Sequence, residues 1–145
     1  MKFTVKQAKG GFFDRAAVVG AVDAATRRVL SRFGAFVRTR ARTSIRKRKS
    51  TSPPGGPPYS HVGTLRKLIF FAYDFARASV VIGPTLSDSP SGAPEILEFG
   101  GTAEISDRDH KGRTKTVRIG PRPYMGPAFQ QELPGLPAMW KDSVR

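Results

Sequence analysis

The feature that most constrains this chain is a helical pattern of apolar residues that runs from about Asp14 to Arg46. Apolar side chains recur there at steps of three and four residues, a spacing that places them on one stripe of an α-helix. Asp14 is a suitable N-cap, because its carboxylate can accept hydrogen bonds from the first backbone N–H groups. We therefore expect one long N-terminal helix over about 14–47, with one face on a core. The stripe consists of Val22, Ala25, Val29, Leu30, Phe33, Phe36 and Val37.

The same stretch is strongly basic. Between Asp23 and Asp74 no acidic residue occurs, and most of the arginines lie opposite the apolar stripe. Arg40 is the exception, because it falls on the stripe itself. This position predicts that the helix runs past its core there or bends near Gly34.

The net charge of +14 lies entirely in the first half of the chain. Residues 1–67 hold sixteen Lys and Arg against two acidic residues, whereas residues 68–145 hold nine of each sign. A surface this one-sided repels itself unless a polyanion or an acidic partner neutralises it, so we expect such a partner. The candidate residues for DNA or acidic-partner contact are Arg38, Arg40, Arg42, Arg46, Lys47, Arg48 and Lys49.

Three interpretations of this charge stay open. The cations could neutralise nucleic-acid phosphates without reading sequence, or they could form a solvated helix face. They could also meet the acidic stretch 88–109 of a neighbouring subunit. Sequence-specific DNA reading is disfavoured, because no second helix follows at helix-turn-helix spacing.

The rest of the chain predicts short strands and a second helix. Residues 50–60 are rich in Pro and Gly and are expected to form an exposed, flexible loop. Leu65–Tyr73 is apolar on both faces, which predicts a central strand or one covered by a neighbouring subunit. Ala78–Ile82 is its expected antiparallel partner, and residues 3–7 are a further short strand.

Further along, Glu95–Phe99 forms a short amphipathic segment, and Thr102–Ser106 and Thr114–Ile119 alternate as a hairpin around a polar tip at 107–113. A C-terminal helix is expected over about 124–143, interrupted by prolines. The predicted fold is a single α+β domain over 1–145. It has a long N-terminal helix, a three- to four-stranded antiparallel sheet within 65–119, and the helices on one face of the sheet.

Residues for catalysis or metal binding are scarce. The chain has no cysteine and only two histidines, which excludes disulfides and thiolate or His-rich metal sites. His61 and His110 both fall in predicted loops, and the pair Glu95 and Glu98 is better explained as part of an acidic surface. No apolar run is long enough for a membrane span, and no signal peptide is recognisable. We expect a soluble intracellular protein that is not an enzyme and takes no cofactor or metal.

Three stretches in order are similar to a known family. Residues 52–67 (SPPGGPPYSHVGTLRK) resemble the loop and Gly-x-Leu-Arg segment that follows the first helix in tail-completion proteins of long-tailed bacteriophages, also described as head–tail joining or minor tail component proteins. Val81-Ile-Gly-Pro84 with Leu97-Glu-Phe-Gly-Gly-Thr102 resembles the family's Val-Gly-Pro and Leu-Glu-Phe-Gly-Thr pair. Residues 121–129 (PRPYMGPAF) resemble its closing run into the last helix. The chain departs from the family at Lys67-Leu68, where Ser-Ile is usual, and at Gly126, where Arg is frequent.

The resemblance implies a structural, non-enzymatic protein that forms a ring, of six or twelve copies, on the portal–tail axis. Its neighbours would be portal or connector proteins and tail-tube or terminator proteins, and genome DNA would pass through the lumen. It also gives roles to single residues, either in the core or in subunit contacts. These residues are Tyr59, Leu65, Phe99, Tyr124, Met125 and Phe129.

Two functions from different classes therefore remain. The leading hypothesis is a virion protein of the phage neck or tail, assembled in the host cytoplasm, that contacts DNA through basic residues. The alternative is a sequence-independent nucleic-acid-binding protein.

Overall fold

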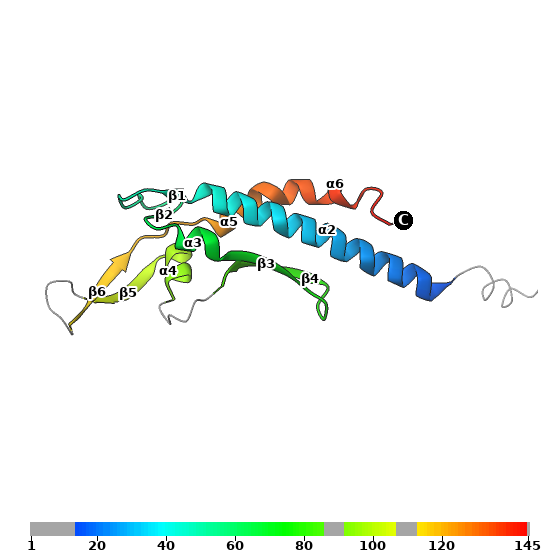
Figure 1. Ribbon diagram of the computed structural model, residues 1–145, viewed down its shortest axis with the longest axis horizontal. Helices are drawn as coiled ribbons and strands as arrows, with labels where there is room; N and C mark the ends of the chain where they lie inside the picture. Colours follow the sequence, from blue (N-terminus) through cyan, green and yellow to red (C-terminus); the bar gives the residue numbers. More distant parts are fainter. Residues whose placement is uncertain (1–13, 86–91, 107–112, 145) are drawn as a thin grey trace, which may run out of the picture.

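A computed structural model describes residues 14–85, 92–106 and 113–144. The predicted α+β class, with a long N-terminal and a short C-terminal helix, is confirmed, and the molecule is elongated along the first helix (Figure 1). The helical elements are α2 (Arg15–Ser44), α3 (Thr64–Leu68), α4 (Ala93–Phe99), α5 (Met125–Glu132), a 3₁₀ turn (Leu133–Gly135) and α6 (Leu136–Trp140). The strands are β1 (Arg46–Lys47), β2 (Tyr59–Ser60), β3 (Ile69–Asp74), β4 (Ser79–Pro84), β5 (Gly101–Ser106) and β6 (Thr114–Ile119).

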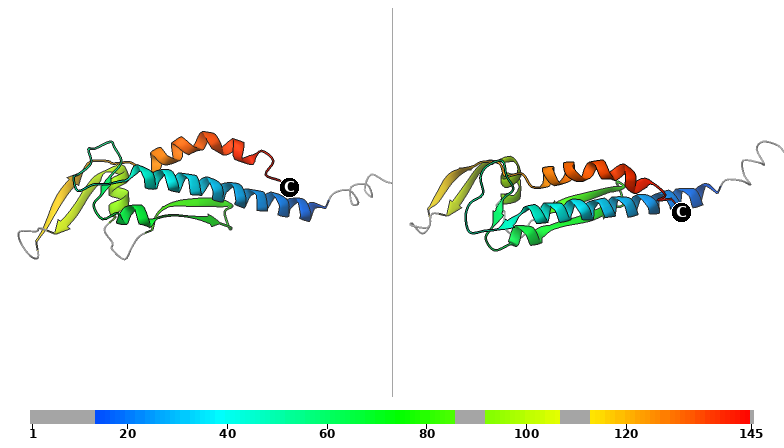
Figure 2. Two further views of the ribbon diagram at one scale, coloured as in Figure 1. Left: turned by 45° about the horizontal axis from the view of Figure 1, so that its top comes forward. Right: turned by 90° about the horizontal axis from the view of Figure 1, so that it is seen from above.

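Helix α2 follows the predicted pattern closely. The Asp14 carboxylate accepts a hydrogen bond from the Ala17 N–H at 3.1 Å, as expected of an N-cap. The helix continues past Gly34 as one continuous helix (Figure 2). Two members of the apolar stripe are more exposed than expected, since Val22 and Phe36 are 44% and 40% exposed. The residues of α2 that are buried are Ala25, Val29, Phe33, Gly34, Val37 and Ala41.

Helix α2 is the middle layer of the molecule. The β3–β4 hairpin packs along one flank of α2, and α5 and α6 pack along another (Figures 1 and 2). Phe33 meets the Phe129 ring of α5 edge-on at 5.6 Å, whereas Gly34, the next residue, faces Phe71 and Val80 of the hairpin. Consecutive residues of a helix point about 100° apart, so α2 buries two flanks at once. Helix α2 therefore lies between the β3–β4 hairpin on one side and α5 with α6 on the other.

The strands form three separate pairs. β3 pairs antiparallel with β4, from Ile69 opposite Pro84 to Asp74 opposite Ser79, and β5 pairs antiparallel with β6. β1 and β2 make a short parallel pair. Both predicted hairpins are confirmed, but the single sheet of three to four strands is wrong, since each sheet among the described residues has two strands.

The predicted strand Leu65–Tyr73 begins too early. Residues 64–68 form α3, and the strand starts at Ile69. Gly63 precedes the helix with φ of +86°, and its carbonyl accepts a hydrogen bond from the Lys67 N–H at 3.2 Å. A short run that is apolar on both faces fits one helical turn as well as a strand, so the pattern alone does not separate them.

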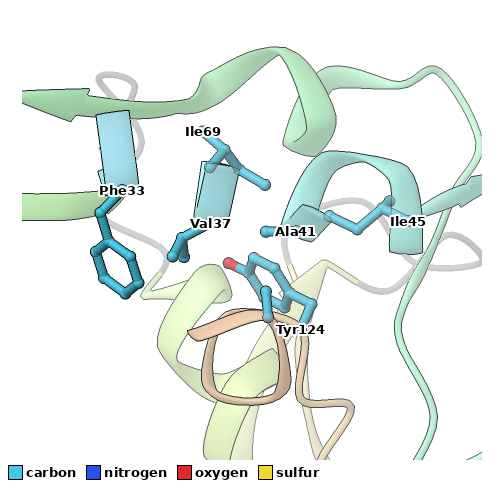
Figure 3. Close-up of a cluster of buried hydrophobic side chains, with 7 residues drawn as sticks. Phe33, Val37, Ala41, Ile45, Ile69 and Tyr124 are labelled. Atoms are coloured by element: carbon cyan, nitrogen blue, oxygen red, sulfur yellow. The ribbon is translucent and has the colours of Figure 1, made fainter. Parts of the chain in front are cut away.

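The core lies where α2, the start of β3 and the start of α5 meet (Figure 3). Tyr124 lies just before α5 and is one of the largest buried side chains, together with Ile45 and Ile69. We call this region, with the adjoining α4, the central junction. Its buried members are Phe33, Val37, Ala41, Ile45, Ile69, Tyr124 and Ala128.

The Pro- and Gly-rich loop 50–60 is exposed over much of its length, as predicted, but two of its residues are anchored in the fold. Ser52 and Pro58 are buried, and the Gly55 N–H donates to the Pro121 carbonyl at 2.8 Å. The loop is therefore held against the segment that leads into α5. The predicted strand 3–7 and most of the hairpin tip 107–113 lie outside the described residues. Within the described ranges, no helix is both long and apolar enough to cross a membrane.

Candidate functional site

The stretches that carry the family resemblance converge at the central junction. The Arg122 guanidinium donates from Nε to the Ser52 carbonyl at 2.9 Å, and the Arg122 N–H donates to the Leu97 carbonyl at 2.6 Å. One residue of the third stretch thus holds both the loop of the first stretch and α4 of the second. Segments about 70 residues apart in the chain are joined by this single side chain.

Glu98 caps helix α5 across the junction. Its Oε2 atom accepts hydrogen bonds from the N–H groups of Tyr124 and Met125 at 2.9 and 3.0 Å, and Oε1 accepts one from Gly126 at 2.7 Å. A carboxylate at a helix N-terminus satisfies orphan donors and interacts favourably with the helix dipole. Burial raises the pKa of Tyr124 to about 12, and the nearby Glu98 charge adds to the effect. Glu98 therefore stabilises the start of α5.

A largely apolar groove of about 400 Å³ opens beside this cap. Pro84, from the Val81–Pro84 stretch, and Pro94 form part of its wall, and Phe99 stands at its edge with 78% of its surface exposed. Glu95 and Glu98 are the charged residues that line it. The groove therefore offers an apolar surface with an acidic margin.

The six residues expected in the core or in subunit contacts differ in how deeply they are buried. Tyr124 is buried, and Leu65 and Met125 pack against the core cluster as half-buried side chains. Phe129 is 42% exposed but also contacts Phe33. Tyr59 is half-buried in β2. Of these six residues, Phe99 is the one whose exposure is hardest to explain by packing within one chain.

The cations in the centre of α2 contact other parts of the same chain. Arg38 Nε donates to the Ile69 carbonyl of β3 at 2.9 Å. Arg40 makes an ion pair with Glu132 of α5 and donates to the side-chain oxygen of Gln131 at 3.1 Å. This explains why Arg40 falls on the apolar stripe, because that stripe faces α5. Arg38 and Arg40 were expected to contact DNA or an acidic partner, and in the structure each also bonds to a neighbouring element of the same chain.

The cations become exposed only after the end of α2. Arg42, still within the helix, is half-buried, whereas Arg46, Lys47, Arg48 and Lys49 are all exposed. Arg48 lies over the Tyr59 ring, with its guanidinium carbon 5.1 Å from the ring centroid. We call Arg46–Lys49 the basic segment. It lies at the end of the molecule that also carries β5 and β6 (Figure 1).

Other polar residues singled out from the sequence do not gather into a site. His61 is exposed at the end of the loop, and His110 lies outside the described residues. No cluster of three or more His, Cys, Asp or Glu suited to a metal ion occurs in the part of the chain that the structure describes. The sequence reasoning missed the roles of Glu98 and Arg122, because each acts on a partner more than twenty residues away and leaves no local signal.

Comparison with known proteins found no matching family model, no matching curated protein and no matching solved structure.

Proposed function

We propose that this chain is a structural, non-enzymatic virion protein of the phage neck or tail that acts in tail completion or head–tail joining. The observation that carries the proposal is the convergence of the three family-like stretches at the central junction. Each of these motifs alone is weak evidence for a family. Arg122 and Glu98 bring them into contact, so that together they hold the loop, α4 and the start of α5. This is expected if they were retained together as the signature of one fold.

The exposed apolar surface supports assembly into a ring. Successive side chains of a strand point to opposite faces, so β3 and β4 turn Phe71 and Val80 toward α2 and leave Phe70 and Val81 exposed. Among the described residues, no further strand pairs with either edge of these hairpins, and such edges are ready templates for pairing with another chain. With Phe99 at the groove, these surfaces suit contacts between copies and with portal, connector, tail-tube or terminator proteins.

The basic segment supports contact with genome DNA in the lumen of such a ring. Its four consecutive cations are exposed and are suited to phosphate contacts that do not depend on base sequence. The acidic margin of the groove, with the exposed Glu95, offers a second partner for basic residues, on a neighbouring copy. A ring with this surface would sit in the virion during DNA ejection, after assembly in the host cytoplasm.

The test is the mass of the full chain in solution, measured by mass photometry and analytical ultracentrifugation, with negative-stain microscopy of any large species. We expect closed rings of six or twelve copies, alone or on added portal or tail-tube protein, without nucleic acid. A chain that stays monomeric under all these conditions contradicts the proposal.

A second function is favoured by the basic segment itself. A sequence-independent nucleic-acid-binding protein would use the same exposed cations without forming a ring. The two functions separate in the experiment above, because this alternative predicts a monomer that binds duplex DNA with a steep salt dependence.

A further inference from the structure

A second cavity, distinct from the groove, lies between the loop 50–61 and strand β6. Its volume is about 340 Å³, and part of its floor is apolar, from Leu97 and Ile119. Side chains with hydrogen-bonding or charged groups also line the cavity. They are Ser50, Thr51, Ser52, Tyr59, His61, Arg118 and Arg122.

The charge of this cavity is opposite to that of the groove. Arg118 and Arg122 line it, and among the residues that the structure describes no carboxylate does, whereas the groove is lined by Glu95 and Glu98. Hydroxyl groups of Ser50, Thr51 and Tyr59 add neutral donors. A cavity with cations, hydroxyl donors and no carboxylate favours an anion with several acceptor oxygens.

The walls of the cavity are held in place before any ligand arrives. Arg122 is fixed by hydrogen bonds to the carbonyls of Ser52 at 2.9 Å and Gly120 at 3.0 Å. Ser52 and Pro58 are buried, so the loop side of the cavity is anchored in the fold. Groups that are already ordered lose less conformational entropy on binding, which favours a defined binding site over a diffuse charged surface.

The cavity is continuous with the basic segment. Arg48 lies over the ring of Tyr59, and Tyr59 lines the cavity. Ser50 follows directly on Lys49, the last residue of the basic segment. A ligand that lies along the basic segment can therefore extend a group into the cavity.

We propose that this cavity is a phosphate-binding site that receives one phosphate of a nucleic-acid strand whose neighbouring phosphates contact the basic segment. The inference rests on the proposed DNA contact and adds a defined site to it. Pockets of about 300 Å³ and above accommodate small organic ligands, so the volume admits a phosphate with its attached sugar. Arg118 and the hydroxyl groups bind the phosphate oxygens, and Arg122 supplies fixed positive charge.

The test uses the full chain and a fluorescently labelled DNA duplex, with binding followed by anisotropy over a range of salt concentrations. Arg118→Ala removes a cation of the cavity, and Arg113→Ala removes an exposed cation just before β6 that does not line it. We expect Arg118→Ala to lower the salt slope by about 1 and to weaken binding about eightfold near 0.1 M salt, as one lost phosphate contact requires. Arg113→Ala should have a clearly smaller effect.

A second pair of variants adds a negative charge, in one variant inside the cavity and in the other outside it, and leaves the core unchanged. Thr51→Asp places a carboxylate in the cavity, whereas Thr116→Asp places one on an exposed position of β6 outside it. Thr51→Asp should weaken binding at least as much as Arg118→Ala, with an unchanged melting temperature, and Thr116→Asp should not. Equal effects within both pairs, in a wild-type chain that binds DNA, overturn the phosphate site and leave the proposed DNA contact standing.

Two further probes separate the sources of the phosphate. Inorganic phosphate and a deoxynucleoside 5′-monophosphate are titrated into the wild-type chain and into Thr51→Asp, with the melting temperature as the readout. Stabilisation by these probes that Thr51→Asp abolishes, without DNA binding, assigns the site to free phosphate and counts against the proposed DNA contact. No stabilisation and no DNA binding overturn both proposals.

Discussion

Arg38 and Arg40 in the centre of α2 bond to other parts of the chain, whereas the cations of the basic segment are exposed, with Arg48 also lying over the Tyr59 ring. Arg38 and Arg40 hold β3 and α5 against the helix. Arg46–Lys49, about two helical turns further along the chain, lie outside the described helix and are exposed. In the sequence these residues form one basic tract without any acidic residue. The fold divides that tract into a part used for packing and a part left for a partner.

This difference teaches that the density of charge along a chain overestimates the size of a binding surface. A guanidinium can donate to a backbone carbonyl or to a carboxylate of the same chain, and it is then committed before any polyanion arrives. The carboxylates show the same division, since Glu98 caps α5 whereas Glu95 is exposed. The following experiments test this division, in order of decreasing effect.

The largest expected effect is the loss of stability when Glu98 is removed. Glu98→Ala leaves three N–H groups at the start of α5 without their acceptor. We expect the free energy of unfolding to fall by about 3 kcal/mol, the sum of a lost cap and lost charge-assisted hydrogen bonds. Denaturant unfolding measures this change. Glu95→Ala, on an exposed position of the same helix, should stay within about 0.5 kcal/mol of wild type.

The buried Tyr124 beside Glu98 predicts an alkaline loss of stability. Its pKa rises from 10.0 to about 12 in the folded state, so the unfolded state ionises first as the pH increases. The contribution of Tyr124 to stability is constant below about pH 10 and then falls by roughly 3 kcal/mol as the pH approaches 12. Denaturant titrations at several pH values should show a shallower decline for Tyr124→Phe than for wild type. Parallel declines would show that Tyr124 is not buried beside the Glu98 carboxylate.

Two glycines of α2 test how closely its centre is packed compared with its exposed first half. A Cβ at Gly34 would lie 2.7 Å from a Val80 methyl carbon, whereas a Cβ at Gly20 meets nothing within 4 Å. Gly34→Ala should cost about 1 to 2 kcal/mol, because overpacking exceeds the gain in helix propensity. Gly20→Ala should instead stabilise by about 0.5 to 1 kcal/mol. Thermal unfolding of both variants checks the signs, and a stabilising Gly34→Ala would mean that the hairpin does not pack closely on α2.

The smallest effects are expected for Arg38 and Arg40, the arginines that bond within the chain. Arg38→Ala should cost about 1 kcal/mol through the lost hydrogen bond to Ile69, and Arg40→Ala about 0.5 kcal/mol, because the ion pair with Glu132 is half exposed. A double-mutant cycle of Arg40 with Glu132 measures the pair directly. A coupling energy of zero would show that the ion pair with Glu132 does not hold Arg40, which would then be available to a partner.

Much of the local structure could be predicted from the sequence, because its signals are local. The N-cap at Asp14, the extent of α2 and the two hairpins follow from periodicity and turn residues. The separation of the strands into pairs could not be predicted, since alternation does not specify which hairpins join. The start of β3 was also missed, because Leu65–Leu68 fits a helical turn and a strand equally.

The candidate site was harder to predict than the fold. The exposed residues of the basic segment were identified from charge alone, but Arg38 and Arg40 were assigned to the same surface. Their partners, Ile69 and Glu132, lie 31 and 92 residues away in the chain. No local pattern indicates such contacts, and the same holds for Glu98 and the start of α5.

The most direct test of the division within the basic tract compares two variants with the same loss of charge. One replaces Arg46, Lys47, Arg48 and Lys49, which follow α2, by alanine, and the other replaces Arg27, Arg32, Arg38 and Arg40, which lie within α2 and contact groups of the same chain. Both are assayed for duplex DNA binding as a function of salt, after circular dichroism shows that they are folded. We predict that the first variant loses about 3 to 4 units of salt slope and about a thousandfold in affinity near 0.1 M salt. The second should keep most of both. Equal losses in the two variants would contradict the account, because charge alone would then determine binding.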